Sequence, residues 1–219
     1  MGKDSLLNME LKPLSEIVDN FFGRTNRKKY FYEIITYVNS MTDFNQIIYQ
    51  RRSIRKFKNQ PVEREKIEWL LKAALLAPSG KRMYPCEFIV VDDTNLLKLI
   101  AESKEHGAEL VKNAPLAIAV IADSAIYDIW VEDASIASTF IMLEAENLGL
   151  GCCWVQMHGR GTADGKSATQ NLKEILGLKD SHEILSVLAI GYKDEEKRVY
   201  TDADLKIEKI HQNRINNRL

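Results

Sequence analysis

A cluster of cations stands out in "YQRRSIRKFK", residues 49–58, in a chain whose charge is otherwise balanced. Ser53 follows Arg51 and Arg52 and precedes Arg55, and an extended backbone would send alternate side chains to opposite sides. Arg51, Ser53 and Arg55 could then face one anion, with two guanidinium groups and one hydroxyl as donors. Charge-assisted hydrogen bonds contribute about 1.5 to 3 kcal/mol each, so three of them would hold a phosphate monoester. The alternative is a solvated basic strand edge, which resists aggregation.

A second candidate is the loop "APSGKRMYP", residues 77–85. Ala-Pro is expected to end a helix, Ser-Gly to make a tight turn, and Lys81 and Arg82 then stand at the exit. Free backbone amides and two cations would suit a planar polar ring or a second phosphate contact. Taken alone, the same residues also fit an ordinary connection between a helix and a strand.

A third candidate is "GLGCCWVQM", residues 149–157, in which two glycines lead directly into an apolar strand. Trp154, Val155 and Gln156 lie at the end of that strand. Apolar and aromatic side chains there could stack against a ring, and the amides at the strand end could donate to a heteroatom. The alternative is an ordinary core strand.

Other chemistries lack their sequence patterns. No phosphate-binding P-loop is present, and neither "GLG" nor "HGRGTADG" has the dinucleotide-binding fingerprint. Cys152 and Cys153 sit in an apolar strand, where thiols are usually inert. We expect no metal site, because four histidines lie in separate segments without metal-ligand spacing: His106, His158, His182 and His211.

Composition limits the class of protein. The 219 residues are 45% hydrophobic and carry a formal net charge of -1, so a core can form but no long-range field holds a nucleic acid. Three cysteines cannot build a disulfide framework, which favours a reducing compartment. No apolar run is long enough to span a membrane and no secretory signal is evident, so we expect a cytoplasmic protein without membrane contact.

The elements that must position these residues alternate between helix and strand. The fold class expected is α+β, a layered domain with a mixed, mostly antiparallel sheet flanked by helices. In the helix expected at 62–77, Ile67, Leu70, Leu71, Ala74 and Leu75 form one apolar face. Periodicity predicts helices over 43–52, 62–77, 95–113, 127–151 and 167–178, and strands over 86–93, 114–123, 152–157 and 183–192.

Two regions are expected in the chain. Residues 1–42 read as an N-terminal helical extension packed on the body or on a partner, with a membrane-surface arm as the alternative. Residues 43–219 form the main domain and end in a polar tail with few anchors. The helix over 127–151 contains "DASIASTFIML", which is small and apolar almost all round, so we expect burial on nearly every side, partly by a second subunit.

The order of these segments resembles the nitroreductase family of FMN-dependent oxidoreductases. The resemblance covers residues 43 to about 200 and rests on "RRSIRKF", "APSG", "FIVVDD", "APLAIAV", "DASIASTFIMLEAENLGLG", "CCWVQM" and "SVLAIGY" in that order. It implies an α+β sandwich that works as an intertwined homodimer, with FMN bound tightly at the subunit interface.

The resemblance also implies roles for individual residues. Arg51, Arg52, Ser53 and Arg55 would hold the FMN phosphate, the ribityl chain and the pyrimidine edge. Pro78, Ser79 and Gly80 would reach the flavin from the partner subunit. Trp154, Val155, Gln156 and Met157 would pack on the isoalloxazine and present a backbone amide near N5. Lys197 and Arg198 would supply a further cation for the phosphate.

This sequence departs from the family pattern after "APSG". The family commonly has Asn and then Gln-Pro-Trp, whereas this chain has Arg82 followed by Tyr84, Pro85 and Cys86. An arginine near the pyrimidine edge would stabilise negative charge on reduced flavin and could alter substrate choice.

The activity implied is a two-step exchange in one cavity. NADH or NADPH would pass hydride to flavin N5, and an electron-poor aromatic acceptor such as a nitroarene or a quinone would then take the electrons. Because the cofactor carries the reactivity, no catalytic side chain is required of the protein. The alternatives are a flavin sensor or FMN-sequestering protein without turnover, and a nucleic-acid binder, which the net charge disfavours.

Overall fold

The computed structural model describes residues 44–218, so the predicted N-terminal extension and its role lie outside the described residues. Within them, four strands form one fully antiparallel sheet in the order β1-β2-β4-β3. The predicted α+β class is therefore confirmed, and the sheet is antiparallel rather than mixed. The strands are β1 (Cys86–Val91), β2 (Leu116–Asp123), β3 (Leu150–Gln156) and β4 (His182–Tyr192).

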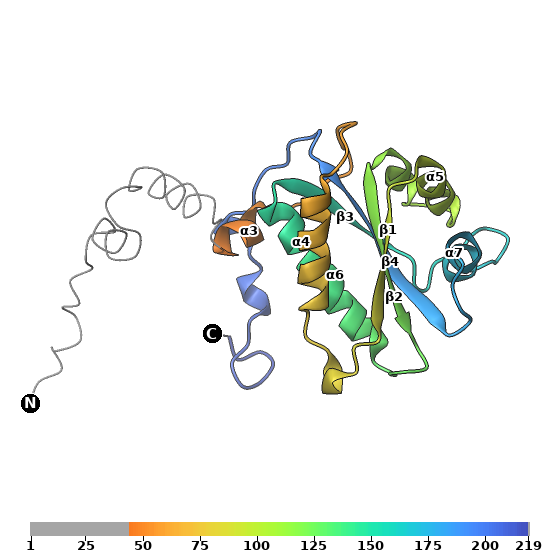
Figure 1. Cartoon of the computed structure of the whole chain (residues 1–219). Helices are drawn as coiled ribbons and strands as arrows, with labels where there is room; N and C mark the ends of the chain where they lie inside the picture. Colours follow the sequence, from red (N-terminus) through yellow and green to blue (C-terminus); the bar gives the residue numbers. More distant parts are fainter. Residues whose placement is uncertain (1–43, 219) are drawn as a thin grey trace, which may run out of the picture. The chain divides into compact units, whose positions relative to one another are not determined.

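Helices cover both faces of this sheet in three layers (Figure 1). The helices are α3 (Phe44–Gln50), α4 (Arg64–Leu75), α5 (Thr94–Glu102), α6 (Trp130–Asn147) and α7 (Ala168–Leu176). Short 3-10 turns occupy Gly80–Arg82, Glu109–Asn113, Asp202–Asp204 and Ile207–Lys209. Helices α4 and α6 pack on one face, and α5 and α7 pack on the other.

The two central strands form the middle of the core. Alternate residues of β2 enter opposite layers: Ala117, Ala119 and Ile121 contact the α5 and α7 side, and Ile118 and Val120 contact the α4 and α6 side. A strand covered on both faces reads as a continuous apolar run rather than an alternating one. This is why the runs at 114–123 and 183–192 were recognisable as strands.

Two predicted helices have different limits in the structure. The helix expected over 95–113 ends at Glu102, and only the short turn Glu109–Asn113 follows it. The connection between the two contains Gly107 with a φ of +78°. Ser103 favours this end because its hydroxyl donates to the carbonyl of Ile100 at 2.8 Å. The helix expected from residue 127 begins at Trp130, with acidic residues in its first turn.

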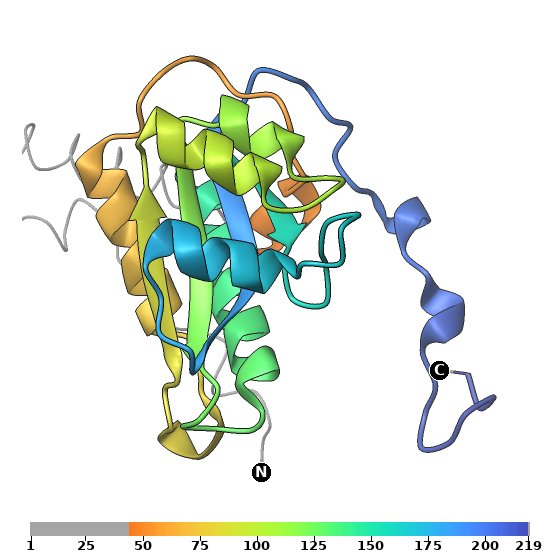
Figure 2. The ribbon, with the colours of Figure 1, turned by 90° about the vertical axis from the view of Figure 1, so that its right-hand side faces the viewer.

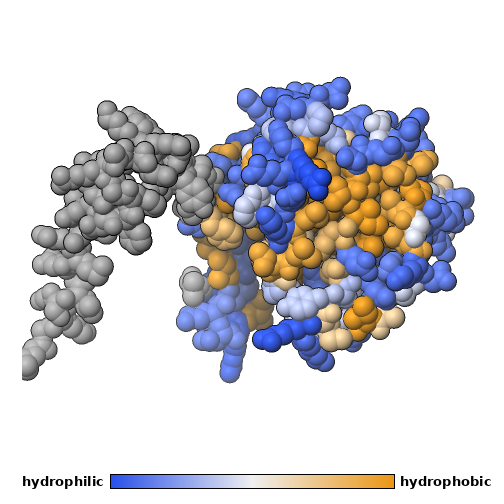
Figure 3. Space-filling view, viewed as in Figure 1, coloured by the Kyte–Doolittle hydropathy of each residue, from blue (hydrophilic) through white to orange (hydrophobic). Residues whose placement is uncertain are grey.

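Helix α4 does not bury its whole predicted apolar face. Leu70 and Ala74 are buried, whereas Leu75 is 67% exposed and Trp69 on the neighbouring face is 48% exposed. Helix α6 likewise exposes part of Ile136 and Phe140, so burial on nearly every side is not reached within one chain. Figure 3 shows apolar side chains gathered over the middle of this side of the molecule, where the β1 edge of the sheet lies.

The C-terminal segment runs away from the layered body (Figure 2). It is anchored near its start, because the Tyr200 N–H donates to the carbonyl of Tyr49 at 2.9 Å. Beyond this point four large apolar side chains are exposed: Leu205, Ile207, Ile210 and Ile215. The predicted polar tail thus has a defined anchor and an apolar component. In residues 44–218 no helix has the length and apolar character needed to cross a membrane.

Candidate functional site

The basic segment, residues 51–58, lies along the β3 edge of the sheet. Ser53 forms a parallel bridge with Cys152, and the Ile54 N–H donates to the Cys152 carbonyl at 3.1 Å. Gly151 permits this close approach, because a Cβ at that position would lie 2.7 Å from the Ile54 side chain. Farther along, the Lys58 N–H donates to the Tyr192 carbonyl at 2.9 Å.

The basic segment does not alternate strictly, because Ile54 and Phe57, three residues apart, are both buried in the core on the α5 and α7 side. Arg51 and Arg55 lie near Cys153: burial raises the pKa of this thiol, and the two positive charges lower it in part. Arg52, Ile54 and Lys58 line a cavity of about 800 Å³ whose wall also includes Lys193, Glu195 and Val199. That Arg51, Ser53 and Arg55 hold one phosphate together stays a prediction.

Arg52 is already engaged by the C-terminal segment. Its guanidinium lies 4.3 Å from the centre of the Tyr200 ring and donates from Nη1 to the carbonyl of Arg198. The predicted contact of Arg52 with a cofactor stays a prediction. The contacts in the structure assign Arg52 to holding residues 198–200.

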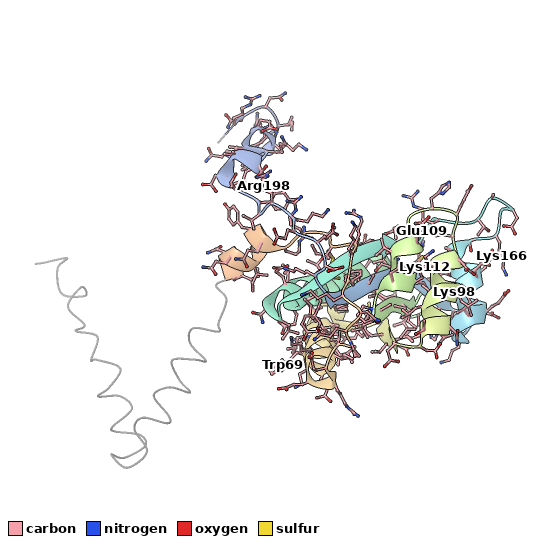
Figure 4. All side chains as sticks on the ribbon, turned by 90° about the horizontal axis from the view of Figure 1, so that it is seen from above. Trp69, Lys98, Glu109, Lys112, Lys166 and Arg198 are labelled. Carbon is pink, nitrogen blue, oxygen red and sulfur yellow. The ribbon has the colours of Figure 1, made fainter. Side chains whose placement is uncertain are left out.

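The two predicted C-terminal cations are both paired with carboxylates. Lys197 Nζ lies 2.6 Å from Glu195 Oε2, and Arg198 contacts both carboxylate oxygens of Asp204, with Nη2 to Oδ1 at 2.5 Å. Arg198 also holds the pKa of Asp204 well below its ordinary value. Figure 4 shows Arg198 on the C-terminal segment beside α3, away from Lys98 and Lys112. The role of Lys197 and Arg198 as phosphate ligands stays a prediction. To bind a phosphate, each cation would first have to leave its carboxylate partner.

The Ser79 loop, residues 78–84, is fixed to helix α6. Ser79 Oγ donates to Asp133 Oδ2 at 2.6 Å, and the Gly80 N–H donates to Asp133 Oδ1 at 3.0 Å. The Tyr84 N–H in turn donates to Ser79 Oγ at 2.9 Å. Asp133 is buried, and each of its carboxylate oxygens has a donor, as a buried charge requires.

The backbone of the Ser79 loop is strained. Lys81, Arg82 and Tyr84 have φ values of 50°, 60° and 46°, a region that residues with side chains rarely adopt. Gly80 is needed by close packing, because a Cβ there would lie 2.6 Å from the Tyr127 hydroxyl. Strain of this kind clusters at ligand-binding loops. A small cavity of about 50 Å³ beside this loop also reaches Cys86 and Phe88 of β1.

The end of β3 combines buried side chains with a polar surface. Val155 and Met157 are buried in the core, so their side chains pack inward. Trp154 Nε1 donates to Gln156 Oε1 at 2.8 Å, and Lys104 Nζ donates to the Gln156 carbonyl at 2.8 Å. Burial lowers the pKa of Lys104, and the nearby charge of Arg160 lowers it further. The polar groups available at this strand end are therefore those of Trp154, Gln156 and Lys104.

Within one chain, the Ser79 loop and the basic segment lie far apart. The loop contacts the first turn of α6 and borders β1, at one edge of the sheet. The basic segment borders β3 at the other edge, and its cavity includes Glu146 in the last turn of α6. At 1.5 Å per residue, Asp133 and Glu146 lie about 20 Å apart along the helix. A site that uses both regions needs more than one copy of the chain.

Three residues that the sequence analysis did not select belong to these arrangements. Asp133 was the acid in an otherwise small and apolar helical stretch, and that contrast was a usable signal. Glu195 accepts from the Arg55 N–H at 2.5 Å but lies in the ordinary charged run "KDEEKR". Lys104 gave no sequence signal for its contact with Gln156.

The layered antiparallel fold, with a basic segment along one sheet edge, is consistent with the nitroreductase-type oxidoreductases. The sequence profile described as "Nitroreductase family" matches residues 48–104 and 97–192, so the chain belongs to this family. The predicted family is thereby confirmed, and with it the general class of activity, that of an oxidoreductase.

Individual relatives agree with this assignment. The chain is 38% identical over 168 residues to a protein of Archaeoglobus fulgidus named "Putative NADH dehydrogenase/NAD(P)H nitroreductase", covering 75% of this chain and 93% of the relative. An FMN-dependent nitroreductase of Clostridium difficile is 46% identical with a TM-score of 0.76, covering 77% and 98% of the two chains. The NADPH:FMN oxidoreductase of Vibrio harveyi, 20% identical with a TM-score of 0.65 and covering 79% and 78%, supports the fold alone.

Proposed function

We propose that this protein is an FMN-dependent oxidoreductase that transfers hydride from NAD(P)H through flavin N5 to an electron-poor acceptor such as a nitroaromatic or a quinone. The observation that carries the proposal is the basic segment laid along β3, in which Ser53, between Arg51 and Arg55, is bridged to Cys152. From Cys152, beside Ser53, four residues of strand lead about 13 Å to Gln156. FMN could therefore lie along this edge, with its phosphate near Ser53 and its isoalloxazine ring near Gln156.

The residues present fit FMN chemically. Two guanidinium groups and a hydroxyl suit a phosphate dianion, because charge-assisted bonds to arginine are the stronger kind. When bound, FMN would supply the two-electron chemistry, because redox reactivity belongs to the cofactor and the protein supplies binding and orientation. Lys104 would hold the Gln156 peptide in place at the ring end, and Trp154 would hold its side chain.

We further propose that the working form is a homodimer in which the Ser79 loop of one protomer completes the site of its partner. The separation of this loop from the basic segment within one chain supports the proposal. So do the exposed apolar side chains of α4 and α6 and those of the C-terminal segment, because exposed apolar surface often marks protein interfaces. Arg82 would then approach the flavin from the partner, as would Pro78, Ser79 and Gly80.

The proposal is tested with purified full-length protein. We expect a yellow protein with about one FMN per chain, a dimeric mass by light scattering, and repeated NAD(P)H oxidation with menadione or nitrofurazone as acceptor. A colourless protein that stays colourless after incubation with FMN would overturn the cofactor assignment. A single stoichiometric reduction without turnover would favour the flavin sensor instead.

A further inference from the structure

Glu195 occupies hydrogen-bond donors within the basic segment that is proposed to hold the phosphate. Its Oε1 accepts from the Arg55 N–H at 2.5 Å and from the Lys56 N–H at 3.2 Å, and Oε2 lies 2.6 Å from Lys197 Nζ. Two backbone amides and an ammonium group are the kind of donor set that binds external anions. Here an internal carboxylate fills it, with its side chain only 14% exposed.

The carboxylate is charged and acts on the same surroundings as the arginines. Lys197 and the backbone N–H of Arg55 hold the pKa of Glu195 below its ordinary value, so it is ionised at neutral pH. Arg51 and Arg55 lower the pKa of the Cys153 thiol, whereas Glu195 raises it. Because Glu195 also accepts a hydrogen bond from the Arg55 N–H, its charge lies close enough to the basic segment to oppose the positive potential there.

We infer that the charge of Glu195 lowers the affinity of the protein for FMN. The carboxylate repels the flavin phosphate, and it also holds Lys197 away from that phosphate. This inference rests on the proposed function. It adds a residue that determines how strongly FMN binds and how far the protein discriminates between flavins with and without a phosphate. FMN, with its phosphate, experiences the repulsion, and riboflavin, which lacks the phosphate, does not. The difference between these two flavins separates a charge effect from a change in protein structure.

The test is Glu195→Gln, which keeps an oxygen to accept from Arg55 and Lys56 but removes the charge. Apoprotein of the full-length chain is titrated with FMN and separately with riboflavin, and binding is followed by flavin fluorescence. Since one unit charge near another changes binding about fivefold in water-like surroundings, we expect the Kd for FMN to fall about fivefold or more. The Kd for riboflavin should stay unchanged.

The matched control is Glu196→Gln, which changes the net charge equally at an exposed neighbour that makes none of these contacts. It should shift the Kd for FMN far less, and Glu195→Asp, which keeps the charge, should not tighten FMN binding. Weaker or unchanged FMN binding by Glu195→Gln, or parallel changes for riboflavin, would overturn the inference.

Two outcomes separate this inference from the proposed function. If the wild-type protein binds FMN and the variant binds it equally well, only the role of Glu195 fails. If the wild-type protein binds neither flavin, the proposed function fails and the inference with it. Glu195→Ala is a second uncharged variant with the same expected sign, and failure of both variants to fold would reduce Glu195 to a structural residue and overturn the inference.

Discussion

Ser79 and Asp133, 54 positions apart in the sequence, are joined by a 2.6 Å hydrogen bond that fixes the loop after α4 to the first turn of α6. The second oxygen of the same carboxylate holds the Gly80 N–H at 3.0 Å. Hydrogen bonds to a buried charge are stronger than neutral ones, so this pair can hold the strained backbone of the next four residues. The bond thereby couples the shape of the Ser79 loop to the packing of α6.

Asp133→Asn tests this coupling. The amide cannot accept from both Ser79 and Gly80, so we expect the free energy of unfolding to fall by about 1 to 3 kcal/mol. We also expect the FMN affinity to fall, because the loop loses its fixed shape. Denaturant unfolding and FMN titration measure the two effects. Asp128→Asn, an exposed change of equal charge, is the control, and equal effects in both variants would contradict a role for the Ser79 contact.

Arg51 and Arg52 are neighbours in sequence with opposite surroundings. Arg51→Ala should weaken FMN binding about 10-fold to 100-fold, the equivalent of one charge-assisted hydrogen bond of about 1.5 to 3 kcal/mol. Arg52→Ala should leave FMN binding nearly unchanged but release residues 198–200, because the contacts with Arg198 and Tyr200 are lost. FMN titration and limited chymotrypsin cleavage near Tyr200 report these outcomes. Equal losses of FMN affinity in the two variants would contradict the separate roles expected for Arg51 and Arg52.

Gly151→Ala should push the basic segment away from β3. The added methyl would lie 2.7 Å from the buried side chain of Ile54, and overpacking of this kind costs about 1 to 3 kcal/mol of unfolding free energy. Chemical denaturation measures this cost. The double variant Gly151→Ala with Ile54→Ala should lose less than the sum of the single changes, because the shortened side chain removes the clash. Strict additivity would show that the two residues do not compete for space.

The parts of the fold that the sequence predicted depend on local pattern. The continuous apolar runs identified the central strands, because a strand covered on both faces is apolar throughout. The grouping of Arg51, Ser53 and Arg55 around one phosphate stays a prediction. The limits of helices were less secure. Leu75 has the right spacing for the buried face of α4 but lies at its last residue, where the supporting layer ends, and it is exposed.

The parts of the site that the sequence missed depend on contacts between distant residues. Nothing in "KDEEKR" distinguishes Glu195 from Glu196, and only the return of the chain after β4 brings Glu195 to the Arg55 amide. Similarly, Lys197 and Arg198 looked like free cations, but the folded chain gives each of them a carboxylate partner. Such pairings are set by tertiary structure, which single-sequence patterns do not encode.

Cys86, at the start of β1, should be far less reactive than an ordinary thiol. Burial raises the pKa of Cys86 to about 12, and the negative charge of Asp133 contributes to the increase. Because the thiolate is the nucleophile, its population at pH 8 is on the order of a thousandfold below that of an unperturbed cysteine. Alkylation by iodoacetamide, followed by mass spectrometry of the Cys86 peptide, should be slow in the folded protein and fast in urea. The folded-state rate should continue to rise between pH 10 and 11, where an exposed thiol with a pKa of about 8.5 has already reached its plateau. A plateau near pH 10 in the folded protein would contradict the burial of this thiol beside Asp133.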